Sequence, residues 1–119
     1  MLVVYIAGPF RAASKHVAGH QDMFEVQRNI MAAMALGLKV WQAGAVALIP
    51  HANTMFFTGS ADDSVWLRGD LELLYRCDAL LLTEDYARSS GARAEREYAL
   101  ANDISVFYHI DNLLLWLKT

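Results

Sequence analysis

The sequence is poor in cysteine, in basic runs and in long apolar segments, and each shortage excludes a class of protein. Cys77 is the single cysteine of the 119 residues, so no disulfide forms within the chain, which fits a reducing cytoplasm. Ten basic residues stand against 13 acidic ones, a net charge of −3 with no basic run, and we expect no nucleic-acid binding. No apolar segment has membrane-spanning length, so we expect no membrane contact.

Several functional motifs are missing as well. Neither a G-x-G-x-x-G fingerprint nor a Walker sequence is present, so dinucleotide and NTP binding by those routes is not expected. His16 and His20 have a spacing that suits a metal on a helix, but no H-E-x-x-H pattern accompanies them, and we expect neither a metal nor a cofactor. Cys77 precedes an apolar run, which predicts a buried thiol and not a nucleophile.

What the sequence does have is apolar content. Hydrophobic residues make up 55% of it, enough for a sizeable core in one domain that spans residues 1–119. The large aromatic side chains exceed what one such core easily hides: Trp41, Phe56, Phe57, Trp66 and Trp116. We therefore expect some of them at the interface of a homodimer or a higher homo-oligomer.

Short apolar runs alternate with helical patterns along the chain. Strands are expected at 2–8, 45–51, 78–83 and 104–109, and helices at about 22–41, 63–76 and 90–102. The segment 112–118 is a fifth strand or a short helix, and the helix would pack Leu113, Leu114 and Trp116 on the core. This alternation predicts an α/β fold, a flavodoxin-like or half-Rossmann three-layer sandwich with a four- or five-stranded parallel sheet.

The ends and faces of the helices can also be predicted. Asp22 caps the first long helix, Gly44 ends it in a left-handed turn, and Asp62 or Asp63 caps the second. In the first helix, apolar residues three or four apart are expected to form one buried stripe: Met23, Val26, Ile30, Met34, Leu38 and Trp41. In the second helix, the residues expected to face inward are Leu67, Leu71 and Leu74.

In a parallel sheet of this kind, ligands bind beyond the carboxyl ends of the strands. The loops expected to meet there are 8–14, 51–57 and 84–91. In the first loop, Gly8 and Phe10 are expected beside the ligand, with Phe10 stacking on it or acting as a hydrophobic lid, and Arg11 is expected to meet an anion. His51 and Asn53 close the second strand and either contact the ligand or simply cap a loop.

The stretch SSGARAEREYAL, residues 89–100, begins a helix at the rim of that site. Ser89 or Ser90 either caps the helix or turns its hydroxyl towards a ligand oxygen, because a helix start has free amide groups and a partial positive charge. Gly91 lets a ligand approach the backbone closely. Glu95 lies about a turn further on, on a face with two alanines that indicate tight packing or a close ligand.

Two other places hold candidate residues. Trp66 and Asp70 are neighbours on the second helix, although Asp70 taken alone is more simply a surface carboxylate, and Gly69 between them admits a neighbouring element or a ligand. The hydroxyl of Tyr5, inside the first strand, needs a partner if it is buried, and a carboxylate at the strand's end would supply one. Asp78 lies at the opposite end of its strand and is interpreted as structural.

The segments VVYIAGPF, WLRGDLELLYRCDALLL and SSGARAEREYAL together resemble the nucleoside 2-deoxyribosyltransferase superfamily, which includes 2′-deoxynucleoside 5′-phosphate N-hydrolases. The resemblance covers residues 2 to about 108. It implies that Glu95, four residues after Gly91, attacks C1′ of a 2-deoxyribosyl group. It further implies that Tyr5 orients this nucleophile and that Asp70 lies near the base or the leaving group. Ser89 resembles the phosphate-binding serine of the nucleotide hydrolases.

The resemblance implies cleavage or transfer at the N-glycosidic bond of a 2′-deoxynucleoside or its 5′-monophosphate, a small-molecule partner. The alternative is a module that binds a nucleotide or nucleotide-sugar in the same pocket without turnover. Its support is Glu97, where the family usually has glycine. We expect Glu97 to face away from Glu95 and to pair with Arg93 on a solvated flank. An interaction subunit without a ligand is the third hypothesis.

Overall fold

The computed structural model describes residues 1–12 and 22–119. Its centre is a sheet of four parallel strands in the order β2-β1-β3-β4. The strands are β1 (Val3–Ala7), β2 (Val46–Leu48), β3 (Ala79–Leu82) and β4 (Ser105–Phe107). This is the flavodoxin-like arrangement, so the predicted α/β fold with a parallel sheet is confirmed.

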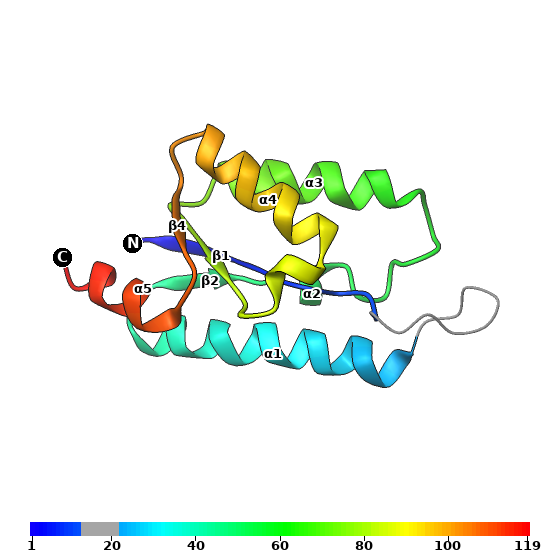
Figure 1. Ribbon diagram of the computed structural model, residues 1–119, viewed down its shortest axis with the longest axis horizontal. Helices are drawn as coiled ribbons and strands as arrows, with labels where there is room; N and C mark the ends of the chain where they lie inside the picture. Colours follow the sequence, from blue (N-terminus) through cyan, green and yellow to red (C-terminus); the bar gives the residue numbers. More distant parts are fainter. Residues whose placement is uncertain (13–21) are drawn as a thin grey trace.

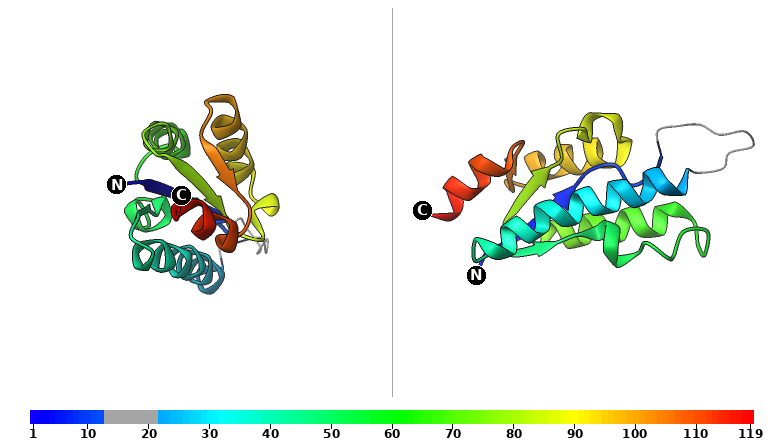
Figure 2. Two further views of the ribbon diagram at one scale, coloured as in Figure 1. Left: turned by 90° about the vertical axis from the view of Figure 1, so that its left-hand side faces the viewer. Right: turned by 90° about the horizontal axis from the view of Figure 1, so that it is seen from below.

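Helices cover both faces of the sheet (Figures 1 and 2). They are α1 (Met23–Gln42), α2 (Pro50–Asn53), α3 (Asp63–Tyr75), α4 (Ser90–Ala101) and α5 (Ile110–Leu117), with a 3₁₀ turn, η2 (Tyr86–Arg88), before α4. α1 and α5 lie on one face, and α3 and α4 lie on the other. The segment after β4 is therefore a helix, with Leu113 fully buried and Trp116 against Phe107 at a ring distance of 5.2 Å.

The central strand β1 explains why the core has two halves. Tyr5 and Ala7 pack with the α3/α4 layer, whereas Val4 and Ile6 pack with the α1/α5 layer. Because helices cover both faces, every residue of β1 after the first is buried, which is why its sequence is apolar without alternation. β1 pairs with β2 and β3, so its carboxyl end at Ala7 lies in the middle of the sheet edge where α4 also begins.

Most of the predicted helix signals are confirmed. Asp22 caps α1 by accepting hydrogen bonds from the first amides of the helix, and Gly44 follows it with φ of +88°. Asp62, and not its neighbour, caps α3 by accepting from the amide of Ser64 at 3.0 Å. Asp78 is structural as predicted, because it accepts a hydrogen bond from the amide of Val3 at 2.8 Å.

The predicted buried stripe of α1 is wrong over its second half. Met34, Leu38 and Trp41 are exposed, as is Met23. Val26 and Ile30 are buried as predicted, and the other buried residues of the helix are Asn29, Ala33, Gly37 and Val40. Each step of four residues turns by about 40° around a helix. Met34 and Leu38, at successive steps of four after Ile30, therefore point progressively away from the sheet. Small residues take their place because the helix lies close to the sheet.

Two further expectations differ from the structure. The strand expected at 45–51 ends at Leu48, and Pro50 then begins α2, because a proline at the first helical position lacks only an amide that would have no partner there. In α3, Leu74 is fully buried and Leu71 is half-buried, but Leu67 is 52% exposed and lines a cleft. No neighbouring element approaches Gly69, since nothing lies within 4 Å of where its Cβ would be.

Gly8 and Gly69 provide a matched test of this packing. A Cβ at position 8 would lie 2.5 Å from Oγ1 and Cγ2 of Thr83, so Gly8→Ala should lower the free energy of unfolding by about 1–3 kcal/mol. The methyl group of Gly69→Ala meets open space, and alanine favours a helix more than glycine does. This substitution should therefore raise the free energy of unfolding by about 1 kcal/mol. Urea unfolding of both variants measures these changes, and a Gly8→Ala protein as stable as the wild type would contradict the described contact between the two strand ends.

Candidate active site

A cleft with a volume of about 620 Å³ lies at the carboxyl ends of the strands. Its walls come from the loop after β1, from α2 and the loop that follows it, from α3, and from residues 88–95 at the start of α4. The structure thus brings together the three loops that the sequence predicts at this edge. α3 forms a fourth wall with Trp66 and Asp70, which the sequence analysis also names as candidate site residues, and with Asp63 and Leu67.

The deepest contact in this cleft joins β1 to α4. Tyr5 is fully buried in the strand, and its hydroxyl donates a hydrogen bond to Oε2 of Glu95. α4 comes this close because Ala92 and Ala99, on the same face as Glu95, are buried with almost no exposed surface. The expectation that a carboxylate partners the Tyr5 hydroxyl is therefore confirmed.

The environment of these groups changes their acidity. Burial raises the pKa of Glu95 to about 7, with the hydrogen bond from Tyr5 opposing this and the charge of Asp70 adding to it. Burial also raises the pKa of Asp70 to about 6. The pKa of Tyr5 is raised far above its ordinary value, by burial first and then by the nearby carboxylates. Tyr5 is therefore a permanent hydrogen-bond donor, and near neutral pH Glu95 exists in both protonation states.

The predicted serines and glycine form the adjoining wall. Ser89 is the N-cap of α4, and its Oγ accepts from the amide of Ala92 at 3.1 Å. Its hydroxyl hydrogen is left to donate elsewhere. Ser90 and Gly91 also line the cleft. A Cβ at Gly91 would meet protein atoms only at 3.8 Å or more, so no neighbouring element approaches its backbone closely.

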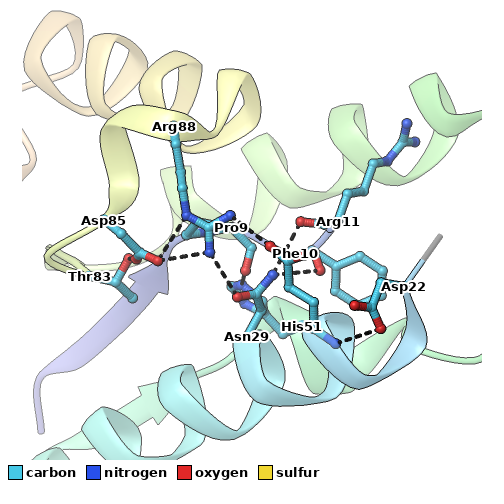
Figure 3. Close-up of polar contacts among 10 residues, drawn as sticks. Pro9, Phe10, Arg11, Asp22, Asn29, His51, Thr83, Asp85 and Arg88 are labelled. Atoms are coloured by element: carbon cyan, nitrogen blue, oxygen red, sulfur yellow. Dashed lines mark hydrogen bonds and ion pairs between the residues drawn. The ribbon is translucent and has the colours of Figure 1, made fainter. Parts of the chain in front are cut away.

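Asn29 holds the loop after β1 in place and is itself held by Arg88, and the sequence analysis identified neither residue (Figure 3). The buried side-chain amide of Asn29 donates to the carbonyls of Phe10 and Arg11 at 3.2 and 3.1 Å. Its Oδ1 accepts from Arg88 at 3.1 Å, and Arg88 also pairs with Asp85 at 2.9 Å. The one available signal was that Asn29 is a polar residue among the buried positions of an amphipathic helix.

His51 holds the same loop from the other side. Its Nε2 lies 3.0 Å from the carbonyl oxygens of both Gly8 and Pro9, and its ring lies 6.1 Å from that of Phe10 (Figure 3). Burial lowers the pKa of His51, although the two carbonyls oppose this. Since carbonyls only accept, Nε2 carries the hydrogen of a neutral imidazole and Nδ1 is an acceptor. Of the described residues, Nδ1 of His51 and Nε1 of Trp66 have no hydrogen-bond partner although both are buried.

A family model with the description "Domain of unknown function (DUF4406)" matches residues 2–108, which include every strand and every cleft residue named above. The chain belongs to the DUF4406 family. No curated protein matches it. Since the family description names no activity, the function of this DUF4406 domain has to be argued from the chemistry of its cleft.

Some predicted site residues lie elsewhere in the DUF4406 domain. Asn53 is exposed and outside the cleft, because His51 and Asn53 lie on one short helix and point about 200° apart. Arg11 lines the cleft, but its guanidinium forms an ion pair with Asp63. The expected pair of Arg93 with Glu97 is wrong: Arg93 donates to the carbonyl of Ala87, and Glu97 pairs with its neighbour Arg96 at 2.6 Å.

The remaining predictions concern metals, the thiol and the membrane. His16 and His20 lie outside the described residues, and within those residues no group of three or more His, Cys, Asp or Glu side chains is placed to hold a metal ion. Cys77 is buried as predicted, and burial together with the charge of Asp78 raises the pKa of its thiol to about 11. No helix in the described ranges is long and apolar enough to cross a membrane.

The raised pKa of Glu95 predicts a loss of stability with rising pH. The folded state binds this proton more tightly than the unfolded chain does, so the stabilisation present below the ordinary pKa of 4.5 is lost as the pH rises through about 7. Between pH 4.5 and 8, the free energy of unfolding of the wild type should fall relative to Glu95→Gln by on the order of 3 kcal/mol. Urea unfolding at several pH values measures this. Glu97→Gln, at an exposed position, should keep the wild-type dependence, and equal profiles for the Glu95→Gln and wild-type proteins would contradict the assignment.

Proposed function

We propose that this DUF4406 domain cleaves or transfers the N-glycosidic bond of a 2′-deoxynucleoside or its 5′-monophosphate, with Glu95 as the nucleophile. The observation that supports this most is the carboxyl group of Glu95, fixed by the Tyr5 hydroxyl on the floor of the cleft and close to a second carboxyl, Asp70. The resemblance to nucleoside 2-deoxyribosyltransferases supports the same role for these three residues.

In the first step, a carboxylate oxygen of Glu95 forms a bond to C1′ of the deoxyribose. The bond from C1′ to the base nitrogen breaks, and its electron pair leaves with the base. The positive charge that develops on the sugar ring is stabilised by the adjacent carboxylate, as in glycoside hydrolysis. The hydrogen bond from Tyr5 keeps one oxygen of Glu95 in position and leaves the other to attack.

The departing base must gain a proton, and Asp70 is suited to supply it. Because burial raises its pKa to about 6, a fraction of Asp70 stays protonated near neutral pH, which an exposed aspartate would not. In the second step, water or another base attacks C1′, the bond to Glu95 breaks, and the carboxylate is regenerated. Asp70, now ionised, can accept the proton that the attacking group releases.

A 5′-phosphate would fit the wall formed by the start of α4. Ser89 accepts from the helix with its oxygen and keeps its hydroxyl hydrogen for a phosphate oxygen, and the first amides of α4 favour negative charge. This arrangement binds an anion without a basic patch, in agreement with the net charge of −3. Ser90 and Gly91 line the same wall.

The alternative of a binding module without turnover depends on Glu97. The side chain of Glu97 is 71% exposed, pairs with Arg96 and does not line the cleft. A glutamate at this position therefore leaves the space around Glu95 unchanged. No feature of the described cleft favours binding without catalysis, so the enzymatic proposal is kept as the single function.

Glu95→Gln tests the proposed nucleophile. Purified protein is incubated with each 2′-deoxynucleoside and 2′-deoxynucleoside 5′-monophosphate, and free base is quantified by chromatography. The amide cannot form the covalent bond to C1′, so base release should fall by about a thousandfold or more. Glu97→Gln is the matched control and should keep wild-type activity. Undiminished base release by Glu95→Gln, or none by the wild type with any substrate, would contradict the proposed function.

We also propose that α1 joins two copies of this domain. Its solvent face carries a row of exposed apolar residues, Phe24, Met31, Met34, Leu38 and Trp41, with successive spacings of seven, three, four and three, and Met23 beside Phe24 is exposed as well. A step of seven followed by alternating steps of three and four is the seam spacing of paired helices, and the row points away from the face that packs on the sheet. An antiparallel pair of α1 helices would bury the whole row in a two-fold interface, with each end of the row facing the opposite end of its copy.

The double variant Met31→Lys/Leu38→Lys tests this interface. Light scattering after size exclusion should give the wild type twice the 13.3 kDa mass of the chain, and the variant should be monomeric because charges in an apolar seam oppose pairing. Leu115→Lys, at an exposed position of α5, is the control and should remain dimeric. A wild type that is monomeric at all concentrations would contradict the interface.

A further inference from the structure

Two residues that line the same cleft each carry a buried side-chain polar atom without a partner: Nδ1 of His51 and Nε1 of Trp66. Within the described part of the chain they are the buried side-chain polar atoms left unpaired. Native proteins rarely leave such atoms unpaired, because burial removes the water that would otherwise bind them. Their common position in the cleft indicates that a ligand supplies both hydrogen bonds.

The chemistry of the missing partners is fixed by the two rings. His51 is only 7% exposed, and its Nε2 hydrogen points to the carbonyls of Gly8 and Pro9, so Nδ1 can only accept. The indole nitrogen of Trp66 can only donate. The ligand must therefore bring an N–H or O–H donor to His51 and an acceptor to Trp66. An ionised phosphate or carboxylate has no donor and does not satisfy His51.

The surroundings of both atoms suit a flat heterocycle. Phe10 lies beside His51, and Phe57 lies beside Trp66 with a ring distance of 5.6 Å and an interplanar angle of 49°. Of these rings, Phe10, His51 and Trp66 line the cleft, and they come from the loop after β1, α2 and α3, whereas Glu95 belongs to α4 and Ser89 caps its start. A substrate whose C1′ lies at Glu95 and whose phosphate lies at the start of α4 would have its base left to fill this aromatic side of the cleft.

We propose that His51 and Trp66 recognise the nucleobase: Nδ1 of His51 accepts a hydrogen bond from a base N–H, and Nε1 of Trp66 donates to a ring nitrogen or carbonyl oxygen of the base. This inference rests on the proposed function. It adds that the base is the group the protein recognises, and that recognition uses an edge of the base with both a hydrogen-bond donor and an acceptor. The role of His51 in holding the loop uses Nε2 alone, so Nδ1 remains available for recognition. A base whose donor nitrogen is methylated should be rejected.

The test measures binding without turnover, in a Glu95→Gln background that keeps the substrate intact. Isothermal titration with the four common 2′-deoxynucleosides identifies the tightest ligand, which is then compared with its analogue methylated at the donor nitrogen of the base. His51→Gln retains an N–H donor that can reach the loop carbonyls but removes the Nδ1 acceptor, and Trp66→Phe removes only the indole N–H. His109→Gln and Trp116→Phe make the same exchanges in or next to α5 and are the matched controls.

In the Glu95→Gln protein without further substitutions, the unmethylated nucleoside should bind at least about tenfold more tightly than its methylated analogue. His51→Gln should weaken binding of the unmethylated nucleoside by about tenfold and abolish the preference, and Trp66→Phe should weaken it about fivefold. Both control variants should bind as the background does. The affinity for 2-deoxyribose 5-phosphate, which has no base, should stay unchanged in all variants. Thermal unfolding confirms that each variant is folded.

Three outcomes would overturn this inference. One is unchanged nucleoside binding by His51→Gln and Trp66→Phe. Another is an equal loss of affinity for 2-deoxyribose 5-phosphate, which would assign the two atoms to the sugar. The third is that none of the four nucleosides binds. Base release by the wild type is measured separately, so a protein that binds with the expected preference but releases no base would contradict the proposed reaction and leave the recognition of the base supported.

Discussion

The hydrogen bond from Tyr5 to Glu95 is the interaction on which the cleft depends. It joins the central strand to the helix that begins at the carboxyl edge of the sheet, and both partners are held by buried neighbours. Tyr5 is fixed by the pairing of β1 with two strands, and Glu95 is fixed because two alanines let α4 lie close to the sheet. The position of the carboxyl group is therefore set by the core of the fold and not by a loop.

The same burial that positions the carboxyl groups also changes what they can do. Burial partly removes Glu95 and Asp70 from solvent, so both keep their protons to higher pH than exposed acids do. Their pKa values are about 7 for Glu95 and about 6 for Asp70. Such a pair is unfavourable for stability when ionised, so a purely structural role offers no reason to bury it. A reaction that needs one carboxylate and one carboxylic acid near neutral pH does offer a reason.

Much of the fold and the centre of the cleft could be predicted from the sequence, because local signals agree with the tertiary structure there. Uninterrupted apolar runs mark β1 and β3, Ser89 caps α4, and an isolated tyrosine in a buried strand requires a polar partner. The prediction failed where packing decides the outcome. Asn29 can be assigned its role only once the loop carbonyls beside it are known. The predicted buried stripe of α1 is exposed over its second half because the helix lies close to the sheet and buries small residues there.

The side-chain amide of Asn29 has a consequence for how the walls of the cleft are held together. One group binds two walls at once, the loop after β1 through its amide nitrogen and the segment before α4 through its oxygen and Arg88. Asn29 therefore couples the two walls, while His51 holds the loop and Asp85 holds Arg88 through separate contacts. Asn29 stands on α1, whereas the Tyr5 and Glu95 pair joins β1 to α4, so the walls and the floor of the cleft are supported from different elements.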